Sequence, residues 1–145
     1  TAGELYAAGR AGNRFAMRLS GATAVAEGAG THACNYMTAG IAVILDDVGH
    51  NFGSGMSGGT AFVYDRQDTL TSRSHKDVKA KIRSVNDNEA DQLKSIIQKH
   101  FDETASLYAK SLLDDWDNAV AHFKVVHGNA PAAQRGGQAL EVVVA

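Results

Sequence analysis

Three glycines recur at a fixed interval in the first half of this chain. Gly21, Gly40 and Gly59 are separated from one another by 19 residues, and each follows a small residue. An apolar run that ends in an acidic residue follows each glycine; the runs are ATAVAE, IAVILD and TAFVYD. A constant period of this length indicates a solenoid, in which every repeat forms one coil. The period therefore constrains the fold more than any local motif does.

The repeat predicts a β-helix over residues 1–85. β-Branched runs separated by glycine are typical of short strands that meet at sharp corners, and glycine adopts the left-handed backbone of such corners without steric cost. Equivalent side chains of successive coils should form inward ladders along the axis. The expected ladders are Val25, Ile44 and Val63, and Ala24, Val43 and Phe62. The expected structural glycines are Gly21, Gly40, Gly58 and Gly59.

The chain changes its periodicity after the repeat. Residues 76–85, KDVKAKIRSV, alternate polar and apolar side chains and predict a last strand. Residues 86–126 have a helical period and predict a cap of three helices. Residues 127–145 have no clear period and contain a proline and a glycine pair, which predicts an extended tail. The fold class is therefore mainly β with α: a single-stranded β-helix with coils of about 19 residues, followed by a C-terminal helical cap, in one structural domain.

The predicted helices have recognisable start signals. Asn88 is the expected N-cap of the first helix, and Ser106 is the expected N-cap of the second. The third helical stretch carries Trp116, Ala119, Val120 and Phe123. These three helices should cover one end of the solenoid, where apolar side chains and unpaired backbone groups would otherwise meet water.

The other end of the predicted solenoid has no cover in this sequence. We expect either that the chain is a fragment of a longer protein or that a partner covers this end. The partner could be a second copy, which would make a homo-oligomer through the uncapped N-terminal end.

Composition excludes several classes of partner. The formal net charge is −2 with both signs mixed, which predicts neither a nucleic-acid nor a membrane surface. No apolar run approaches the roughly 20 residues that a membrane span needs. The single cysteine, Cys34, rules out an internal disulfide framework and fits a reducing compartment, so we expect a cytoplasmic protein.

The stretch GSGMSGG, residues 53–59, contains the spelling G-x-G-x-x-G of a dinucleotide-binding loop. That loop works between a strand and a helix whose N-terminus faces the phosphates. Here the next residues, TAFVYD, predict a strand instead. We therefore interpret the stretch as a corner of the β-helix and expect no nucleotide site.

The search for a catalytic or metal site yields weak candidates. His32 and Cys34 lie two residues apart in a glycine-rich coil, and His50 belongs to the next coil. No pair of histidines has the short spacing of a metal site, and a cysteine acts as a nucleophile only beside an activating base. We expect no catalytic, cofactor-binding or metal-binding residues in this chain, and hence a structural or interaction module.

Two long segments carry a family resemblance. GNRFAMRLSGATAVAEGAGTHACNYMTAG (residues 12–40) and GHNFGSGMSGGTAFVYD (residues 49–65) resemble the C-terminal domain of the glutamate synthase large subunit. HFDETASLYAKSLLDDW (residues 100–116) is similar to its helical end. Thr31, Ala33, Asn35 and Ala39 depart from the Asp, Gly, Glu and Gly that we expect in the family, His50 stands in place of Arg, and the tail after Val126 does not match.

The resemblance implies a right-handed β-helix of the GXGXG type with no catalytic residues of its own. It implies that the domain packs between the glutamine amidotransferase domain and the FMN and iron–sulfur synthase domain of an enzyme that makes glutamate from glutamine and 2-oxoglutarate. FMN and the cluster are then expected only in other domains, and the partners are other domains or subunits of that enzyme. The family β-helix is also longer than the coils seen here.

Other functions stay open at this point. The repeat also resembles a subunit of formylmethanofuran dehydrogenase, although that subunit lacks the helical end. The chain could also be a diverged freestanding interaction protein, or an enzyme that uses His32, Cys34 and His50 from adjacent coils.

Overall fold

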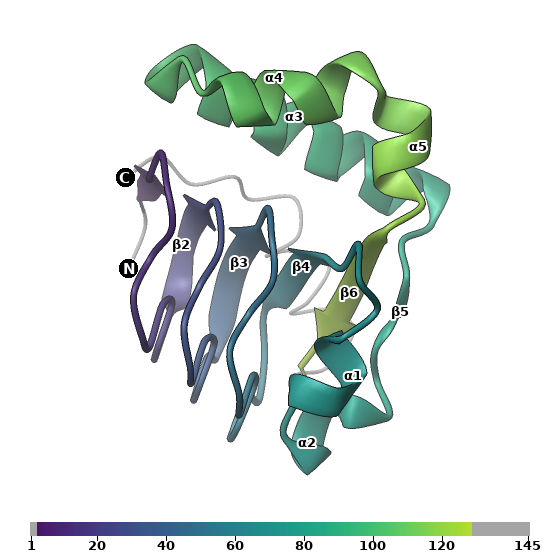
Figure 1. Ribbon diagram of the computed structural model, residues 1–145. Helices are drawn as coiled ribbons and strands as arrows, with labels where there is room; N and C mark the ends of the chain where they lie inside the picture. Colours follow the sequence, from purple (N-terminus) through teal and green to yellow (C-terminus); the bar gives the residue numbers. More distant parts are fainter. Residues whose placement is uncertain (1–2, 129–145) are drawn as a thin grey trace.

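The computed structural model describes residues 3–128 and contains one sheet of six strands (Figure 1). Four of the strands are parallel and begin successive coils, in the order in which they occur along the chain. Their return segments run beside one another in Figure 1, which is the arrangement of a β-solenoid. The predicted β-helix is confirmed. Its strands are β1 (Glu4–Tyr6), β2 (Ser20–Ala26), β3 (Ala39–Ile44) and β4 (Thr60–Tyr64).

The parallel ladder ends at an antiparallel strand. β6 (Phe123–His127) pairs with β4, and the short β5 (Arg83–Ser84) pairs with the far side of β6. The strand predicted over residues 76–85 is therefore wrong for most of its length. The helix α2 (Lys76–Lys79) occupies its first half, shortly after α1 (Leu70–Arg73), and only the two residues of β5 are extended. Val78 is buried in the interior core although it lies on a helix, so alternation over ten residues did not distinguish a strand from a helical turn.

The predicted pairs are correct between β3 and β4 and wrong between β2 and β3, and the expected inward direction is wrong for Val43 and Phe62, which face the helices. Val43 pairs with Phe62 and Ile44 with Val63, at the expected interval of 19 residues. On β2 an irregularity between Ser20 and Thr23 shortens the interval to 18, so that Val25 pairs with Val43 rather than with Ile44. A shift of one residue exchanges the two faces of a strand. Val25 therefore shares a face with Val43, and Ala26 takes the place next to Ile44.

Both faces of β3, of β4 and of the second half of β2 are buried, in two separate cores, whereas Leu5 of β1 is 55% exposed. One face lines the interior of the coils, where it meets side chains of the corner segments. The other face packs against the helices. Strands that are covered on both sides are expected to be almost continuously apolar, which agrees with the runs ATAVAE and IAVILD. The largest interior side chains include Met37, Ile44 and Phe52, whereas Val43 and Phe62 belong to the helix-side core.

Three helices form the cover of this second core: α3 (Asp87–Thr104), α4 (Leu107–Asp114) and α5 (Trp116–Val120). α3 and α4 lie side by side along the coils (Figure 1), and Lys99 of α3 reaches Glu4 of β1. The helices thus extend along the side of the coil stack as far as β1, and the prediction that they cover one end of the solenoid is wrong, since β6 pairs with β4 at that end. Leu93, Ile96 and Ile97 are the buried side chains that α3 contributes to the core.

The helix start signals are partly as predicted. Ser106 is the N-cap of α4, as expected, and accepts a hydrogen bond from the Ala109 amide. The N-cap of α3 is Asn86 and not Asn88, because Asn86 forms a reciprocal capping box with Glu89. Phe123 was expected on the third helix but begins β6, since α5 ends at Val120 and the chain then joins the edge of β4.

The predicted tail, residues 127–145, lies outside the described residues except for its first two positions. His127 is the last residue of β6, so the ordered fold continues beyond the boundary expected at residue 126. Among residues 3–128, no helix has the length and apolar character that crossing a membrane requires.

Candidate functional site

The corners of the coils have an unusual backbone. Alternate residues in each corner have a positive φ: Arg14, Ala16 and Arg18 in the first, His32, Cys34 and Tyr36 in the second, and Asn51, Gly53 and Gly55 in the third. Amides of one corner donate to carbonyl oxygens of the next, as from Arg18 to Asn35 and from Tyr36 to Ser54, both at 2.8 Å. The corners therefore stack in register along the coil axis. The left-handed backbone expected of glycine is here adopted mostly by other residues.

The stretch GSGMSGG forms the third corner and leads directly into β4. A Cβ atom at Gly55 would lie 2.5 Å from Cδ1 of Tyr36, because that ring covers the glycine. A Cβ atom at Gly59, which has a φ of 80°, would lie 2.7 Å from the Met37 methyl group and 3.1 Å from backbone atoms. Space that a phosphate would need is thus filled by side chains of the preceding coil, and a strand follows in place of a helix. The residues present do not fit a nucleotide or a flavin phosphate.

Of the other expected structural glycines, Gly21 and Gly40 also have a positive φ, of 136° and 94°. Gly58 is buried, and its backbone lies against Gly128.

The three candidate catalytic residues do not form a reactive group. The His32 amide donates to the His50 carbonyl oxygen, which is a backbone contact between coils. The His32 ring accepts a hydrogen bond from the Asn35 amide at 3.0 Å. Cys34 is completely buried, and burial raises the pKa of its thiol to about 12. Within residues 3–128, no three metal-ligating side chains gather at one point.

Acidic residues at or next to the ends of the apolar runs have different contacts in each coil. Asp65, on the coil of β4, accepts hydrogen bonds from the amides of Thr69 and Leu70 and so fixes the start of α1. Asp47, next to the repeat position at Asp46, forms ion pairs with Arg10 at 2.7 Å and with Arg73 at 3.1 Å. These arginines lower the pKa of Asp47, although burial acts in the opposite direction.

Glu27, the acidic residue at the end of β2, forms hydrogen bonds to the helices that cover the sheet. Its carboxylate accepts hydrogen bonds from the His100 ring at 2.8 Å, from the Ser106 hydroxyl, and from the Gly9 amide at 3.0 Å. Burial acts to raise the pKa of Glu27, but the donors His100 and Ser106 outweigh it and lower the pKa. One carboxylate therefore joins the end of a strand to α3 and to the N-cap of α4. The recurring acidic position was visible in the sequence, but its partners lie 73 and 79 residues away.

A second polar chain fixes β6. The Thr60 hydroxyl lies 2.9 Å from Nδ1 of His127, and Nε2 of His127 donates to Glu89 at 2.7 Å. Glu89 also accepts two hydrogen bonds from Arg83. Burial opposes the ionisation of Glu89, but the hydrogen bonds from Arg83 and Asn86 bring its pKa down to about 2. Hydroxyl, imidazole and carboxylate are linked here in the same order as in a catalytic triad. Thr60, however, is buried in the strand pair of β4 and β6, so its hydroxyl oxygen is not accessible to a substrate.

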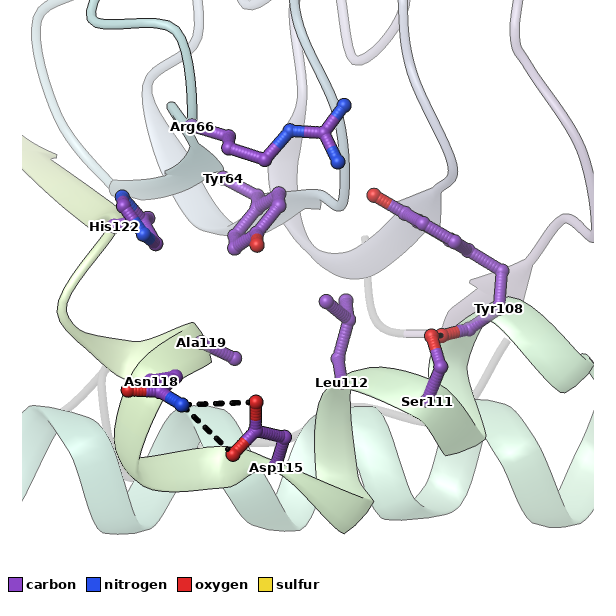
Figure 2. Close-up of a pocket in the computed structure, with 9 residues that line it drawn as sticks. All are labelled: Tyr64, Arg66, Tyr108, Ser111, Leu112, Asp115, Asn118, Ala119 and His122. Atoms are coloured by element: carbon purple, nitrogen blue, oxygen red, sulfur yellow. Dashed lines mark hydrogen bonds between the residues drawn. The ribbon is translucent and has the colours of Figure 1, made fainter.

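A cavity of about 230 Å³ lies between the end of β4 and the helices α4 and α5 (Figure 2). Its buried lining consists of Tyr64 on β4 and of Leu112 and Ala119 on the helices opposite (Figure 2), and its polar lining includes Arg66, Tyr108 and Asp115. The Tyr108 hydroxyl donates to the Leu45 carbonyl oxygen at 2.5 Å, and both Asp115 oxygens accept from the Asn118 amide at 3.0 Å. Sequence analysis did not find this cavity, because its lining comes from residues 64–66 and 108–122 without a common motif.

The architecture and the repeat define a class of protein. This chain belongs to the GXGXG motif family, whose model matches residues 1–129.

Several relatives are glutamate synthases. The chain is 44% identical over 124 residues to the chloroplastic ferredoxin-dependent glutamate synthase of Spinacia oleracea, which is 85% of this chain and 8% of that protein. It is 44% identical over 141 residues to the glutamate synthase (NADPH) large chain of Bacillus subtilis, covering 89% of this chain and 9% of the relative. The chain thus spans less than a tenth of the length of these relatives. The resemblance to a GXGXG-type domain of glutamate synthase is confirmed.

Proposed function

We propose that this chain is a non-catalytic scaffolding domain of a glutamate synthase. In this proposal it packs between an amidotransferase domain and an FMN and iron–sulfur synthase domain of an enzyme that makes glutamate from glutamine and 2-oxoglutarate. The observation that carries the proposal is that 85–89% of this chain matches one segment of glutamate synthases that are much longer. The matched segment makes up only 8–9% of those proteins. We also propose that it acts in the cytoplasm.

The chemistry of the side chains supports a structural role. Glu27, Asp47 and Glu89 are each held by two or more donors within the fold. Carboxylates that are fixed in this way stabilise the contact between solenoid and helices and are poor acid or base catalysts, because a low pKa leaves them without a proton to give and with little tendency to take one.

Two observations support the proposal that the cofactors of the enzyme are held by other domains. An iron–sulfur cluster is held by several cysteine thiolates, whereas the sequence contains one cysteine, which is buried as a thiol. The third corner has no room for a flavin phosphate. FMN and the cluster are therefore assigned to other domains of the parent enzyme.

The close packing of the coils supports the proposed scaffold role. Three parallel strand pairs join β1 to β4, and both faces of β3 and β4 are buried. Such a body keeps a constant distance between whatever binds to its surfaces, because close-packed interiors resist deformation. In the proposed enzyme, the domain would set the distance between the two sites of chemistry.

A domain exchange tests the proposal. The matching segment of the Bacillus subtilis large chain is replaced by this chain, and glutamine-dependent glutamate synthesis and glutaminase turnover are measured. We expect both activities to persist, and a destabilised insert such as Gly59→Val to uncouple or abolish them. A folded chimera that hydrolyses glutamine but makes no glutamate, even with the unaltered insert, would argue against the scaffold role.

The purified chain gives a second test of the same proposal. A scaffold has no bound flavin, no metal by elemental analysis and no glutaminase turnover of its own. Any of these signals would favour an independent enzyme instead.

A further inference from the structure

The three stacked corners form a surface without acidic residues. The segments 12–18, 30–37 and 49–56 contain no aspartate or glutamate. We define the corner face by its cationic and aromatic residues, which are Arg14, Arg18, His32, Tyr36 and His50. Arg14, Arg18 and His50 are exposed, and Tyr36 retains 51% of its accessible surface, which is unusual for a large aromatic side chain.

Arg18 and Tyr36 are stacked in a fixed arrangement. The Arg18 guanidinium lies 5.7 Å from the centre of the Tyr36 ring, within range of a cation–π interaction. The ring in turn covers Gly55 of the third corner. The three positions are equivalent in successive coils and all have positive φ, at 57°, 57° and 69°.

The backbone at these positions favours glycine, yet two coils carry large side chains there. A left-handed conformation costs a residue with a Cβ atom about 1–2 kcal/mol, and it persists where the surrounding structure imposes it, as the stacked corners do here. The third coil avoids this cost with Gly55. In the first two coils the same backbone presents an arginine and a tyrosine to solvent, and these two residue types are enriched among the contacts that dominate protein interfaces.

The surrounding charges select an anionic partner. Of the acidic residues nearest in the coil repeat, Glu27 is paired with His100 and Asp47 with Arg10 and Arg73, and Asp46 lies three residues before the third corner segment. Helix α2 has the sequence KDVK and a net charge of +1. It lies against the third corner, since a Cβ atom at Gly53 would be 2.7 Å from the Val78 side chain of this helix. Figure 1 shows α2 beside the lower corners of the coils.

We propose that the corner face is a docking surface for an acidic polypeptide segment of a neighbouring domain or subunit. This inference rests on the proposed scaffold role, for which it names a contact surface. The carboxylates of the segment would pair with Arg14 and Arg18, and an apolar group would lie on the exposed part of the Tyr36 ring. A protein segment fits better than a nucleic acid because the chain has a net charge of −2 and only a narrow cationic strip.

The test measures binding of a fluorescent poly-L-glutamate peptide to the 145-residue chain by anisotropy at low salt. The variant R14Q/R18Q should weaken binding about three- to tenfold, the sum of two exposed ion pairs. The variant R14K/R18K keeps the charges and should retain most of the binding. The matched control K94Q/K110Q removes the same charge from exposed helical positions and should bind like the wild type.

Equal losses in R14Q/R18Q and K94Q/K110Q would overturn the proposal, since only net charge would then matter. Tighter binding of a double-stranded DNA fragment than of poly-L-glutamate would overturn it in favour of a nucleic-acid surface. Circular dichroism verifies that each variant is folded. The assay uses no enzyme activity, so it can fail while the domain exchange succeeds, and the reverse is also possible.

Discussion

Replacing Glu27 by glutamine should loosen the contact between the solenoid and the helices. The carboxylate accepts hydrogen bonds from His100, Ser106 and Gly9, and the His100 ring is completely buried. The glutamine side chain of the Glu27→Gln variant would keep one acceptor oxygen, so its amide group would face either the Gly9 N–H, which now donates to Oε1, or both His100 and Ser106, which share Oε2. At least one charge-assisted hydrogen bond is lost, which costs about 1.5–3 kcal/mol.

This free energy can be measured by urea unfolding with circular dichroism. We expect a fall of about 2–3 kcal/mol in the free energy of unfolding at pH 7. For a domain of this size, the midpoint of thermal unfolding should fall by roughly 6–9 °C. The matched control is Glu103→Gln, a change of the same chemistry at an exposed position of α3, and it should leave the stability within about 0.5 kcal/mol.

The stability difference between wild type and Glu27→Gln should depend on pH, and the pKa of Glu27 fixes the direction of that dependence. The pKa of Glu27 is lowered in the folded state from its ordinary 4.5, so its ionised form stabilises the fold. That contribution is complete above the ordinary pKa and disappears as the pH falls through the folded value. The difference between wild type and Glu27→Gln should therefore shrink in acid. A difference below about 0.5 kcal/mol at pH 7, or one that stays constant down to acid pH, would refute the reasoning.

Three further predictions concern the corners and the interior of the coils. Gly59→Val should cost about 2–4 kcal/mol of folding free energy, because the new side chain meets Met37 and backbone atoms at a φ of 80°; a midpoint of urea unfolding equal to that of the wild type would contradict this. Titration with NAD or FAD should show no saturable binding in either protein. Cys34 should react with Ellman's reagent only when the chain unfolds, since the thiol is fully buried and its pKa is about 12; stoichiometric labelling of the native protein within minutes would show that the site opens.

The period of the glycines was sufficient to predict the solenoid, but not its register. Spacing along the sequence fixes the average length of a coil, whereas the irregularity after Ser20 removes one residue from a single coil. Because side chains alternate across a strand, this one residue decides that Val25 faces the helices with Val43. A local irregularity of this kind leaves no clear signal in a repeat of only three copies.

The polar contacts were the least predictable part of the structure. Glu27 was visible as one of three acidic residues at equivalent positions, but its partners His100 and Ser106 come from helices whose docking no local pattern specifies. The same is true of β6, whose antiparallel pairing with β4 joins residues 60–64 to 123–127. Contacts over such separations depend on the packing of the whole chain, and the sequence pattern reports only on neighbours.

The antiparallel direction of β6 has a consequence for how this architecture can change in evolution. A parallel coil can be duplicated only where the next strand continues in the same direction, and β6 reverses that direction at β4. Tandem gain or loss of whole repeats is thus confined to the parallel coils from β1 to β4, while β6 closes the β4 side. Homologues of different length should therefore align from their helical ends backwards, with the number of coils as the variable.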